Sequence, residues 1–139
     1  MDSFIKFYNY TYYNHPKKSG DSYYIAVQNI SLNQKILYKH KDLNDSNPQV
    51  FIDTNQYSTN GSVTLVFYYF SPNGKYCAYG LSENGSDWIK IKIKDTQTLQ
   101  DLDEEIVKTK KFFSVEWHKT NKGFYYAVRH CFVLIVLTD

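Results

Sequence analysis

The chain repeats a short pattern of residues at intervals of about 50. Three stretches each begin with a turn glycine, continue with one or two aromatic residues and reach an alanine. The three alanines are Ala26, Ala78 and Ala127, which are 52 and 49 residues apart. Strand-rich repeats of this length are typical of β-propeller blades, whereas leucine-rich and helical repeats have shorter or helical units. The repeat therefore predicts an all-β chain, a partial β-propeller built from four-stranded antiparallel blades.

Short runs of strand-forming residues alternate with Gly, Asn, Ser and Pro along the chain. Aromatic residues make up 18% of the sequence, and such side chains favour the half-buried surface of a sheet. A period of 3.6 residues, which would indicate helices, is almost absent. We predict nine strands, at residues 22–28, 35–40, 49–53, 63–70, 76–81, 87–94, 112–117, 124–129 and 131–137.

The residues of one expected hairpin turn explain why the chain reverses there. Between Phe70 and Tyr76 the chain carries Pro72, Asn73 and Gly74. Proline presets one turn dihedral, and Asn-Gly accepts the positive φ that a tight reversal requires. We therefore expect a tight turn between two antiparallel strands at this point.

Residues 88–94 alternate strictly between isoleucine and lysine after Trp88. Because side chains of a strand point to opposite faces in turn, the pattern predicts a buried isoleucine face and a solvated lysine face. The acidic segment 101–105 is expected to form a short helical turn or an exposed connection. It does not have the fixed spacing of a calcium-binding loop, so we predict no metal site there.

Charge and cysteine content exclude several classes of partner. The 16 basic and 14 acidic residues give a net charge of +2, which is too small to attract nucleic acid or an anionic membrane. Cys77 and Cys131 have no second close pair, as a zinc or redox site would require. We expect no cofactor and no metal. The start of the chain does not resemble a secretory signal, and the apolar stretch 131–137 is too short to span a membrane, so we expect a cytoplasmic protein.

The stretch 70–88 resembles the second-blade region of the prolyl oligopeptidases, a family of cytosolic serine peptidases. The resemblance is carried mainly by Tyr-Gly-Leu-Ser at 79–82 and Gly-Ser-Asp-Trp at 85–88. It extends upstream through 34–38 and 50–53 and downstream through 117–126, and it covers roughly residues 8–128.

This resemblance implies that residues 1–130 are the first two or so blades of a seven-bladed propeller. In the family the propeller caps an α/β-hydrolase domain, restricts access to short proline-containing peptides, and leaves cleavage after proline to a Ser-Asp-His triad in the hydrolase domain. We expect that domain and the remaining blades to be partners in the parent protein and to be absent from this chain. Residues 131–139 form an apolar tail unlike the family, which we interpret as sequence at a truncation. We therefore predict a fragment that gates access to the enzyme and is inactive alone.

The family resemblance implies one substrate-pocket residue in this chain. In the family, an aromatic side chain of the propeller reaches the outer part of the substrate pocket from the strand just before the tryptophan that corresponds to Trp117. That position matches Phe112, and a register shift of one would give Phe113 instead. An ordinary core phenylalanine is the competing interpretation.

We assign no catalytic residue. A hydrolase nucleophile lies in a Gly-x-Ser-x-Gly turn between strand and helix, and Ser86, the nearest candidate, has no second glycine after it. The four histidines show no arrangement with Ser or Asp that singles one out: His15, His40, His118 and His130. The alternative function is a non-enzymatic, β-rich protein-interaction module.

Overall fold

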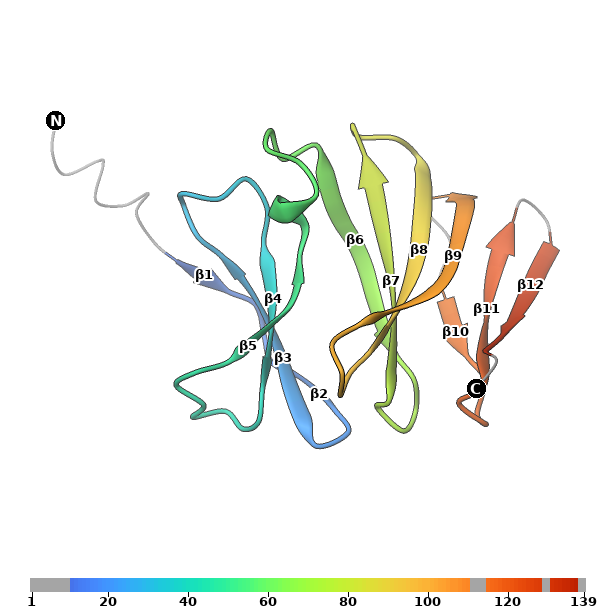
Figure 1. Ribbon diagram of the computed structural model, residues 1–139, viewed down its shortest axis with the longest axis horizontal. Coiled ribbons are helices and arrows are strands. Elements are labelled where there is room, and N and C mark those ends of the chain that lie inside the picture. Colours follow the sequence, from blue (N-terminus) through green and yellow to red (C-terminus); the bar gives the residue numbers. More distant parts are fainter. Residues whose placement is uncertain (1–10, 111–114, 129–130, 138–139) are drawn as a thin grey trace, which may run out of the picture. The chain divides into compact units, whose positions relative to one another are not determined.

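Three antiparallel sheets make up almost all of the regular structure in the computed structural model, which describes residues 11–110, 115–128 and 131–137 (Figure 1). The chain divides into two compact units, Met1–Gly61 and Ser62–Asp139. The first unit contains one sheet, and the second unit contains two. In the described residues the only helical element is a single 3₁₀ turn, η1 (Thr54–Gln56), so the prediction of an all-β chain is confirmed.

The first sheet is blade-like, although it is formally five-stranded. Its strands are β1 (Tyr12–Tyr13), β2 (Lys17–Ser19), β3 (Ser22–Gln28), β4 (Ile36–His40) and β5 (Gln49–Asp53). Both β1 and β2 pair with β3 antiparallel, β3 pairs with β4, and β4 pairs with β5. The two short strands therefore act as one interrupted outer strand, and the sheet has the four-stranded order expected of a blade. The sequence did not predict β1 and β2.

The core of the first unit is aromatic and aliphatic. Tyr24 and Phe51 are buried and meet edge to face, with ring centroids 4.9 Å apart, and Leu37 is fully buried on the strand between theirs. Beside this core, the amide of Asn55 joins two segments. Its Oδ1 accepts from the backbone N–H of Gln34 at 2.9 Å, and its Nδ2 donates to the Gln34 carbonyl at 3.0 Å. This pair of bonds holds the start of β4 against η1.

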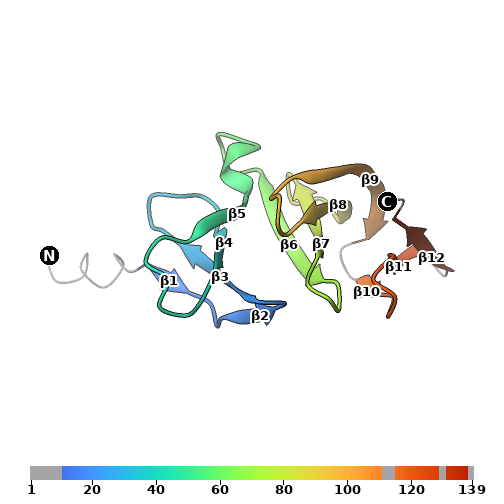
Figure 2. The same ribbon diagram turned by 60° about the horizontal axis from the view of Figure 1, so that its bottom comes forward.

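The second unit contains a four-stranded and a three-stranded sheet, each with its strands in sequence order (Figure 2). The second sheet consists of β6 (Val63–Phe70), β7 (Tyr76–Glu83), β8 (Trp88–Asp95) and β9 (Asp101–Lys110). The third sheet consists of β10 (Val115–Trp117), β11 (Gly123–Val128) and β12 (Cys131–Val136). These simple antiparallel meanders match the blade architecture that the repeat predicted.

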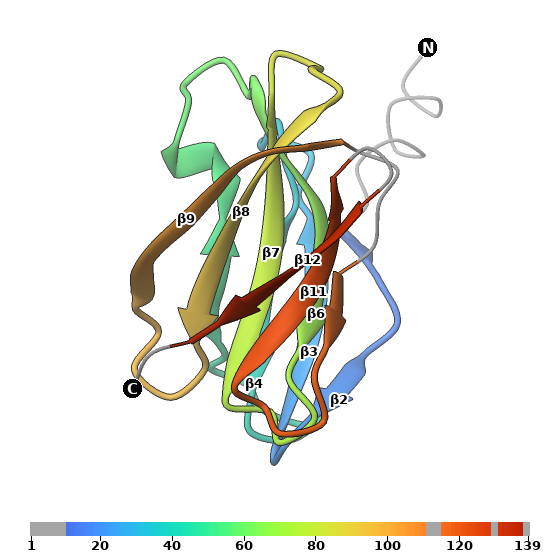
Figure 3. The same cartoon turned by 90° about the vertical axis from the view of Figure 1, so that its right-hand side faces the viewer.

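A shared hydrophobic core joins the second and third sheets. In Figure 3 the third sheet lies in front of the second, and β10 contacts β6 while β11 contacts β9. The second sheet supplies Ala78 and three isoleucines, and the third sheet supplies aromatic and aliphatic residues. The buried members are Ala78, Ile89, Ile91, Ile93, Val115, Trp117, Phe124 and Leu137. Packing of one sheet face on the next is what each blade of a propeller needs to complete its core.

The repeat seen in the sequence corresponds to equivalent places in the three sheets. The three alanines of the repeat lie on corresponding strands, each of which is the neighbour of the first edge strand of its sheet. They are Ala26 on β3, Ala78 on β7 and Ala127 on β11, and they are 5%, 0% and 7% exposed. The turn before β7 closes as expected, because Gly74 has a φ of 72° and its N–H donates to the Ser71 carbonyl at 2.8 Å.

The prediction for the acidic segment 101–105 was wrong. These residues begin β9, which pairs with β8 from Asp101 opposite Lys94 to Lys110 opposite Trp88. Acidic residues have low strand propensity. Here they form a strand because pairing with the edge of β8 and with its lysines outweighs that preference.

The prediction for the isoleucine and lysine faces of β8 was half right. Ile89, Ile91 and Ile93 are buried, as expected. The lysines, however, are not a freely solvated face, since Lys94 is only 9% exposed. Lys94 is shielded from solvent because the carboxylate of Asp101, on β9, lies over the lysine face.

Candidate functional site

The predicted substrate-pocket residue falls, in the sequence, between the last strand of the second sheet and the first strand of the third. Phe112 and its register alternative Phe113 are outside the described residues. Their flanks are described: Lys110 pairs with Trp88 at the end of β9, and Val115 pairs with Tyr126 at the start of β10. The connection therefore leaves the second sheet beside Trp88 and enters the third beside Tyr126. The assignment of Phe112 to a substrate pocket stays a prediction.

A cluster of charged and polar side chains lies on the lysine face of β8. The carboxylate of Asp101 contacts Lys94 Nζ at 2.9 Å and Lys92 Nζ at 3.2 Å. The phenol of the fully buried Tyr79 donates to the same carboxylate at 2.9 and 3.0 Å. Lys94 Nζ also donates to the backbone carbonyl of Leu99 at 3.2 Å. The cluster thus ties three neighbouring strands and the β8–β9 turn together.

Electrostatics keep the Asp101 carboxylate charged. Its partial burial alone would raise its pKa, but the hydrogen bond and charge of Lys94, with hydrogen bonds from Tyr79 and Lys92, outweigh burial and hold the pKa of Asp101 below its ordinary value. A carboxylate neutralised by two lysines is a poor base. The arrangement therefore stabilises the sheet and is not suited to acid–base chemistry.

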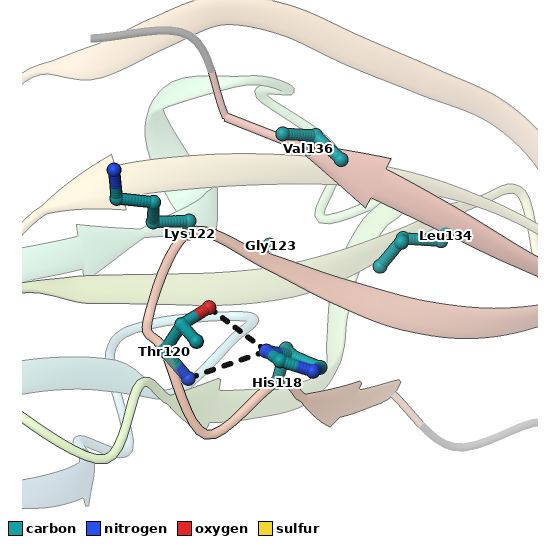
Figure 4. Close-up of a pocket in the computed structure, with 6 residues that line it drawn as sticks. All are labelled: His118, Thr120, Lys122, Gly123, Leu134 and Val136. Atoms are coloured by element: carbon teal, nitrogen blue, oxygen red, sulfur yellow. Dashed lines mark hydrogen bonds between the residues drawn. The ribbon is translucent and has the colours of Figure 1, made fainter.

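A hollow of about 180 Å³ opens on the third sheet, around the turn between β10 and β11 (Figure 4). Its lining residues are His118, Thr120, Lys122, Gly123, Leu134 and Val136. The backbone N–H of Thr120 donates to His118 Nδ1 at 3.2 Å, and the Thr120 hydroxyl lies 2.8 Å from the same nitrogen. Since Nδ1 accepts, the neutral imidazole carries its proton on Nε2. The hollow therefore combines the imidazole of His118 and the side chain of Lys122 with an aliphatic wall formed by Leu134 and Val136.

The other candidate residues are Ser86 and the histidines. Ser86 is in the turn between β7 and β8, where its N–H donates to the Glu83 carbonyl at 2.9 Å and its hydroxyl accepts from the Trp88 N–H at 3.1 Å. His15 and His118 are exposed, and His130 is outside the described residues. Both ring nitrogens of His40 are buried and have no hydrogen-bond partner. Among the described residues, the hydrogen-bond partners of Ser86 are Ser82, Glu83 and Trp88, and none of them is a histidine.

Neither a metal-binding cluster nor a membrane-spanning helix is found in the described residues. No group of three or more His, Cys, Asp or Glu side chains there is placed to hold a metal ion. No helix among them is long and apolar enough to cross a membrane.

Sequence reasoning missed the Asp101 cluster and the hollow. The sequence did carry a signal for the cluster, because the acidic run begins seven residues after the Ile-Lys alternation ends and could pair with its lysines in a hairpin. The hollow depends on which residues of β11 and β12 lie opposite each other, and a single sequence does not give that register.

Comparison with known proteins supports the resemblance noted from the sequence. The sequence profile of the family described as "Prolyl oligopeptidase, N-terminal beta-propeller domain" matches residues 1–130. A prolyl endopeptidase of Elizabethkingia meningoseptica is 35% identical over 120 residues, which cover 86% of this chain and 16% of that protein. A prolyl oligopeptidase of Omphalotus olearius is 30% identical over 146 residues, covering 91% of this chain and 20% of that protein. The chain therefore spans about a fifth or less of the length of these relatives.

Solved structures agree with the sequence comparison. A structure from a study of two prolyl endopeptidases superposes with a TM-score of 0.76 over 86% of this chain and 17% of that chain; at 22% identity it supports the fold alone. Prolyl oligopeptidase B of Galerina marginata, bound to a 35mer hydrolysis and macrocyclization substrate, superposes with a TM-score of 0.71 at 29% identity, over 85% of this chain and 19% of that chain.

Proposed function

Since this chain belongs to the prolyl oligopeptidase family, through its N-terminal β-propeller domain, we propose that it serves as the opening blades of the propeller of a peptidase. In that protein these blades help to select which proline-containing peptides reach a hydrolase domain. Cleavage itself belongs to the hydrolase domain, because the sequence has no Gly-x-Ser-x-Gly turn.

The observation that carries the proposal is the succession of blade-like sheets over the residues that match the family. The first sheet ends at Asp53, the second runs from Val63 to Lys110, and the third begins at Val115. Each is an antiparallel meander, and the second and third share one core, as consecutive blades do. A relative from Galerina marginata is described as bound to a 35mer substrate, which supports a peptide as the substrate class.

Within this function, we propose that Phe112, with Phe113 as its register alternative, supplies an aromatic surface to the outer part of the substrate pocket. The support is the family match together with the place of Phe112 in the sequence, between the end of β9 at Lys110 and the start of β10 at Val115. Aromatic side chains contribute large contact areas to bound peptides.

A chimeric enzyme tests both parts of the proposal. Residues 8–128 would replace the corresponding region of the Elizabethkingia meningoseptica prolyl endopeptidase, and cleavage of a fluorogenic proline peptide would be measured. We expect a folded, active chimera in which Phe112→Ala lowers kcat/KM by about tenfold, the loss typical of one contact in a substrate pocket. Tyr57→Ala, an exposed aromatic of the first unit, is the matched control. An inactive but folded chimera would contradict the propeller role, and unchanged kcat/KM in both Phe112→Ala and Phe113→Ala would contradict the pocket role.

We also propose a cytosolic location. Cys77 is a buried thiol, and a reducing compartment keeps such thiols in this state. Fractionation of cells that produce the protein, followed by immunodetection, would test this, and recovery in the secreted fraction would contradict it.

A further inference from the structure

The turn between β7 and β8 contains an asparagine followed by a glycine. Asn84 and Gly85 have φ values of 52° and 70°, and the Ser86 N–H donates to the Glu83 carbonyl at 2.9 Å. A four-residue turn with positive φ at both central residues is a type I′ turn, a usual two-residue connection of a hairpin. The turn belongs to the second of the three sheets and lies far in the sequence from either end of the chain.

An Asn-Gly pair carries the groups for a reaction within the chain. The backbone nitrogen of the glycine gives up its proton and attacks Cγ of the asparagine. A new C–N bond forms, the side-chain amide C–N bond breaks, and ammonia leaves with the proton. Water then opens the five-membered imide ring at one of its two carbonyls, which gives either aspartate or isoaspartate. Glycine favours the attack because it has no side chain to obstruct its nitrogen.

The structure restrains one Asn-Gly pair of this chain by hydrogen bonds. The sequence contains three such pairs, at 60–61, 73–74 and 84–85. Asn73 Oδ1 accepts from the Ser71 hydroxyl at 2.8 Å and from the Lys75 N–H at 3.1 Å. The Gly74 N–H, which would have to attack, donates to the Ser71 carbonyl at 2.8 Å. Both reacting groups of the 73–74 pair are therefore held.

The 60–61 pair is restrained through its glycine. The N–H of Gly61 donates to the Ser58 carbonyl at 3.5 Å, and its carbonyl accepts from Gln34 Nε2 at 2.8 Å. The α-carbon of Gly61 also lies against Asn33, since a Cβ at Gly61 would be 2.4 Å from the Asn33 Cβ. Gly61 therefore has little room to turn its nitrogen toward Asn60.

The 84–85 pair has neither restraint. The backbone bonds of this turn use the Asn84 N–H, which donates to the Ser62 carbonyl at 2.8 Å, and the Ser86 N–H. Among the described residues, the Asn84 side-chain amide, the Asn84 carbonyl and the Gly85 N–H have no hydrogen-bond partner. Apart from its chain neighbours, nothing lies within 4 Å of a Cβ built on Gly85. The peptide unit between Asn84 and Gly85 can therefore rotate.

Rotation of this peptide unit brings the reacting atoms together. It converts a type I′ turn into a type II′ turn, and the bond between Glu83 and Ser86 closes either type. Type II′ is the mirror image of type II, so the ψ of its first central residue is about −120°. At that ψ the nitrogen of the next residue eclipses Cβ, which is the arrangement that closure of the five-membered ring requires.

We propose that Asn84 is a site of spontaneous deamidation, and that its isoaspartyl product opens the β7–β8 turn. Isoaspartate adds one carbon to the backbone of a turn that a single bond to Ser86 closes. Ser86 is itself fixed, because its carbonyl accepts from the Ser82 hydroxyl at 2.7 Å and its hydroxyl accepts from the Trp88 N–H at 3.1 Å. The longer backbone therefore strains the turn instead of moving Ser86.

Peptide mapping of the 139-residue chain after incubation at mildly alkaline pH tests the site. Cleavage after lysine releases residues 76–90, in which Asn84 is the only amide side chain, and residues 42–75, which contain Asn60 and Asn73. Deamidation replaces NH₂ by OH, and fragment masses locate the change. We expect Asn84 to react at least about tenfold faster than Asn60 or Asn73, roughly the effect of one hydrogen bond on a barrier. Equal rates in the folded chain, or a faster reaction at Asn73, would overturn the proposal.

The same map in urea separates the effect of the turn from that of the neighbouring residues. Each of the three asparagines precedes a glycine, so their rates should converge once the chain is unfolded. If Asn84 kept the same lead in urea, the lead would not come from the turn, and the proposed mechanism would be wrong. Circular dichroism confirms which state each sample is in.

Two variants isolate the effect of the product. Asn84→Gly accepts the positive φ and has no amide, so residues 76–90 should show no mass increase over the same period. Asn84→Asp carries the new charge without the extra backbone carbon. The isoaspartyl form, separated by chromatography from aged wild type, should therefore have a lower urea midpoint than Asn84→Asp. Equal midpoints would contradict opening of the turn by isoaspartate.

Discussion

The indole N–H of Trp117 donates a hydrogen bond of 2.8 Å to the backbone carbonyl of Tyr69, 48 residues earlier in the chain. A second bond with the same separation joins the backbone N–H of Asn73 to the side-chain oxygen of Asn121, at 2.8 Å. Both link the second sheet to the third, and the separation of 48 is close to the repeat period. The sheets are thus joined at equivalent points of the repeat, by specific bonds as well as by apolar packing.

Replacing Trp117 by phenylalanine should destabilise the second unit. Trp117 is 9% exposed and packs on Phe124, with ring centroids 5.2 Å apart. The change leaves the Tyr69 carbonyl without its indole donor and removes part of the ring, which costs about 2 kcal/mol of unfolding free energy. Urea unfolding followed by circular dichroism measures this. Trp88→Phe is the control, because Trp88 is 46% exposed and the same change there should cost about 0.5 kcal/mol or less. Equal losses in the two variants would contradict the role of the bond.

Asparagine at position 101 should remove part of the stability of the chain at neutral pH. The Asp101 carboxylate is bound by Lys92, Lys94 and Tyr79, and the amide cannot balance the two lysines. Because the group is only partly buried, we expect a loss of about 1 to 3 kcal/mol at pH 7.

The pH dependence of that loss has a definite sign. The pKa of Asp101 is lowered in the folded chain by its lysine and tyrosine partners despite partial burial. The stabilisation is therefore present above the ordinary value of 3.8 and disappears as pH falls through the lower, folded value. The difference between wild type and Asp101→Asn should shrink between pH 5 and pH 3 in urea unfolding. Asp103→Asn, at an exposed position of the same strand, is the control, and an equal pH profile for both variants would count against the cluster.

The glycine of the Tyr-Gly-Leu-Ser motif has a packing explanation. A Cβ at Gly80 would lie 2.5 Å from a ring carbon of Phe67 and 2.8 Å from a methyl of Ile89. Gly80→Ala should therefore cost about 1 to 3 kcal/mol by overpacking, measured as a lower urea midpoint with an unchanged slope. At Gly85 nothing lies within 4 Å of a Cβ, but φ is +70°. Gly85→Asn tests that contrast, since asparagine tolerates this conformation and should cost under about 1 kcal/mol. A neutral Gly80→Ala would show that the ring of Phe67 moves freely.

The features that could be predicted from sequence are those fixed by local pattern. The alternation at Ile89, Ile91 and Ile93 identified a buried face, and Pro72-Asn73-Gly74 identified a turn, because each depends only on neighbouring residues. The recurrence of alanine identified equivalent strands, because it reflects the same packing problem in each sheet.

The features that could not be predicted depend on contacts between distant residues. Strand β9 is acidic and does not resemble a strand until Lys94 and Lys92 lie beside Asp101. Strand β1 is two residues long and exists only as a partner of β3. In these cases tertiary pairing outweighs local propensity, and one sequence does not contain that information in readable form.

The 139-residue chain should show no peptidase activity on a fluorogenic proline peptide. Acyl transfer needs a nucleophile held beside a base. Ser86, the serine nearest to a hydrolase motif, lies in a turn, where its hydroxyl accepts a hydrogen bond from the N–H of Trp88. In the described residues no histidine is bonded to it. The assay would compare the chain with the Elizabethkingia meningoseptica prolyl endopeptidase under the same conditions and repeat it with Ser86→Ala. Turnover that survives repurification and is lost in Ser86→Ala would show that this turn serine is a nucleophile, and would overturn the assignment of cleavage to another domain.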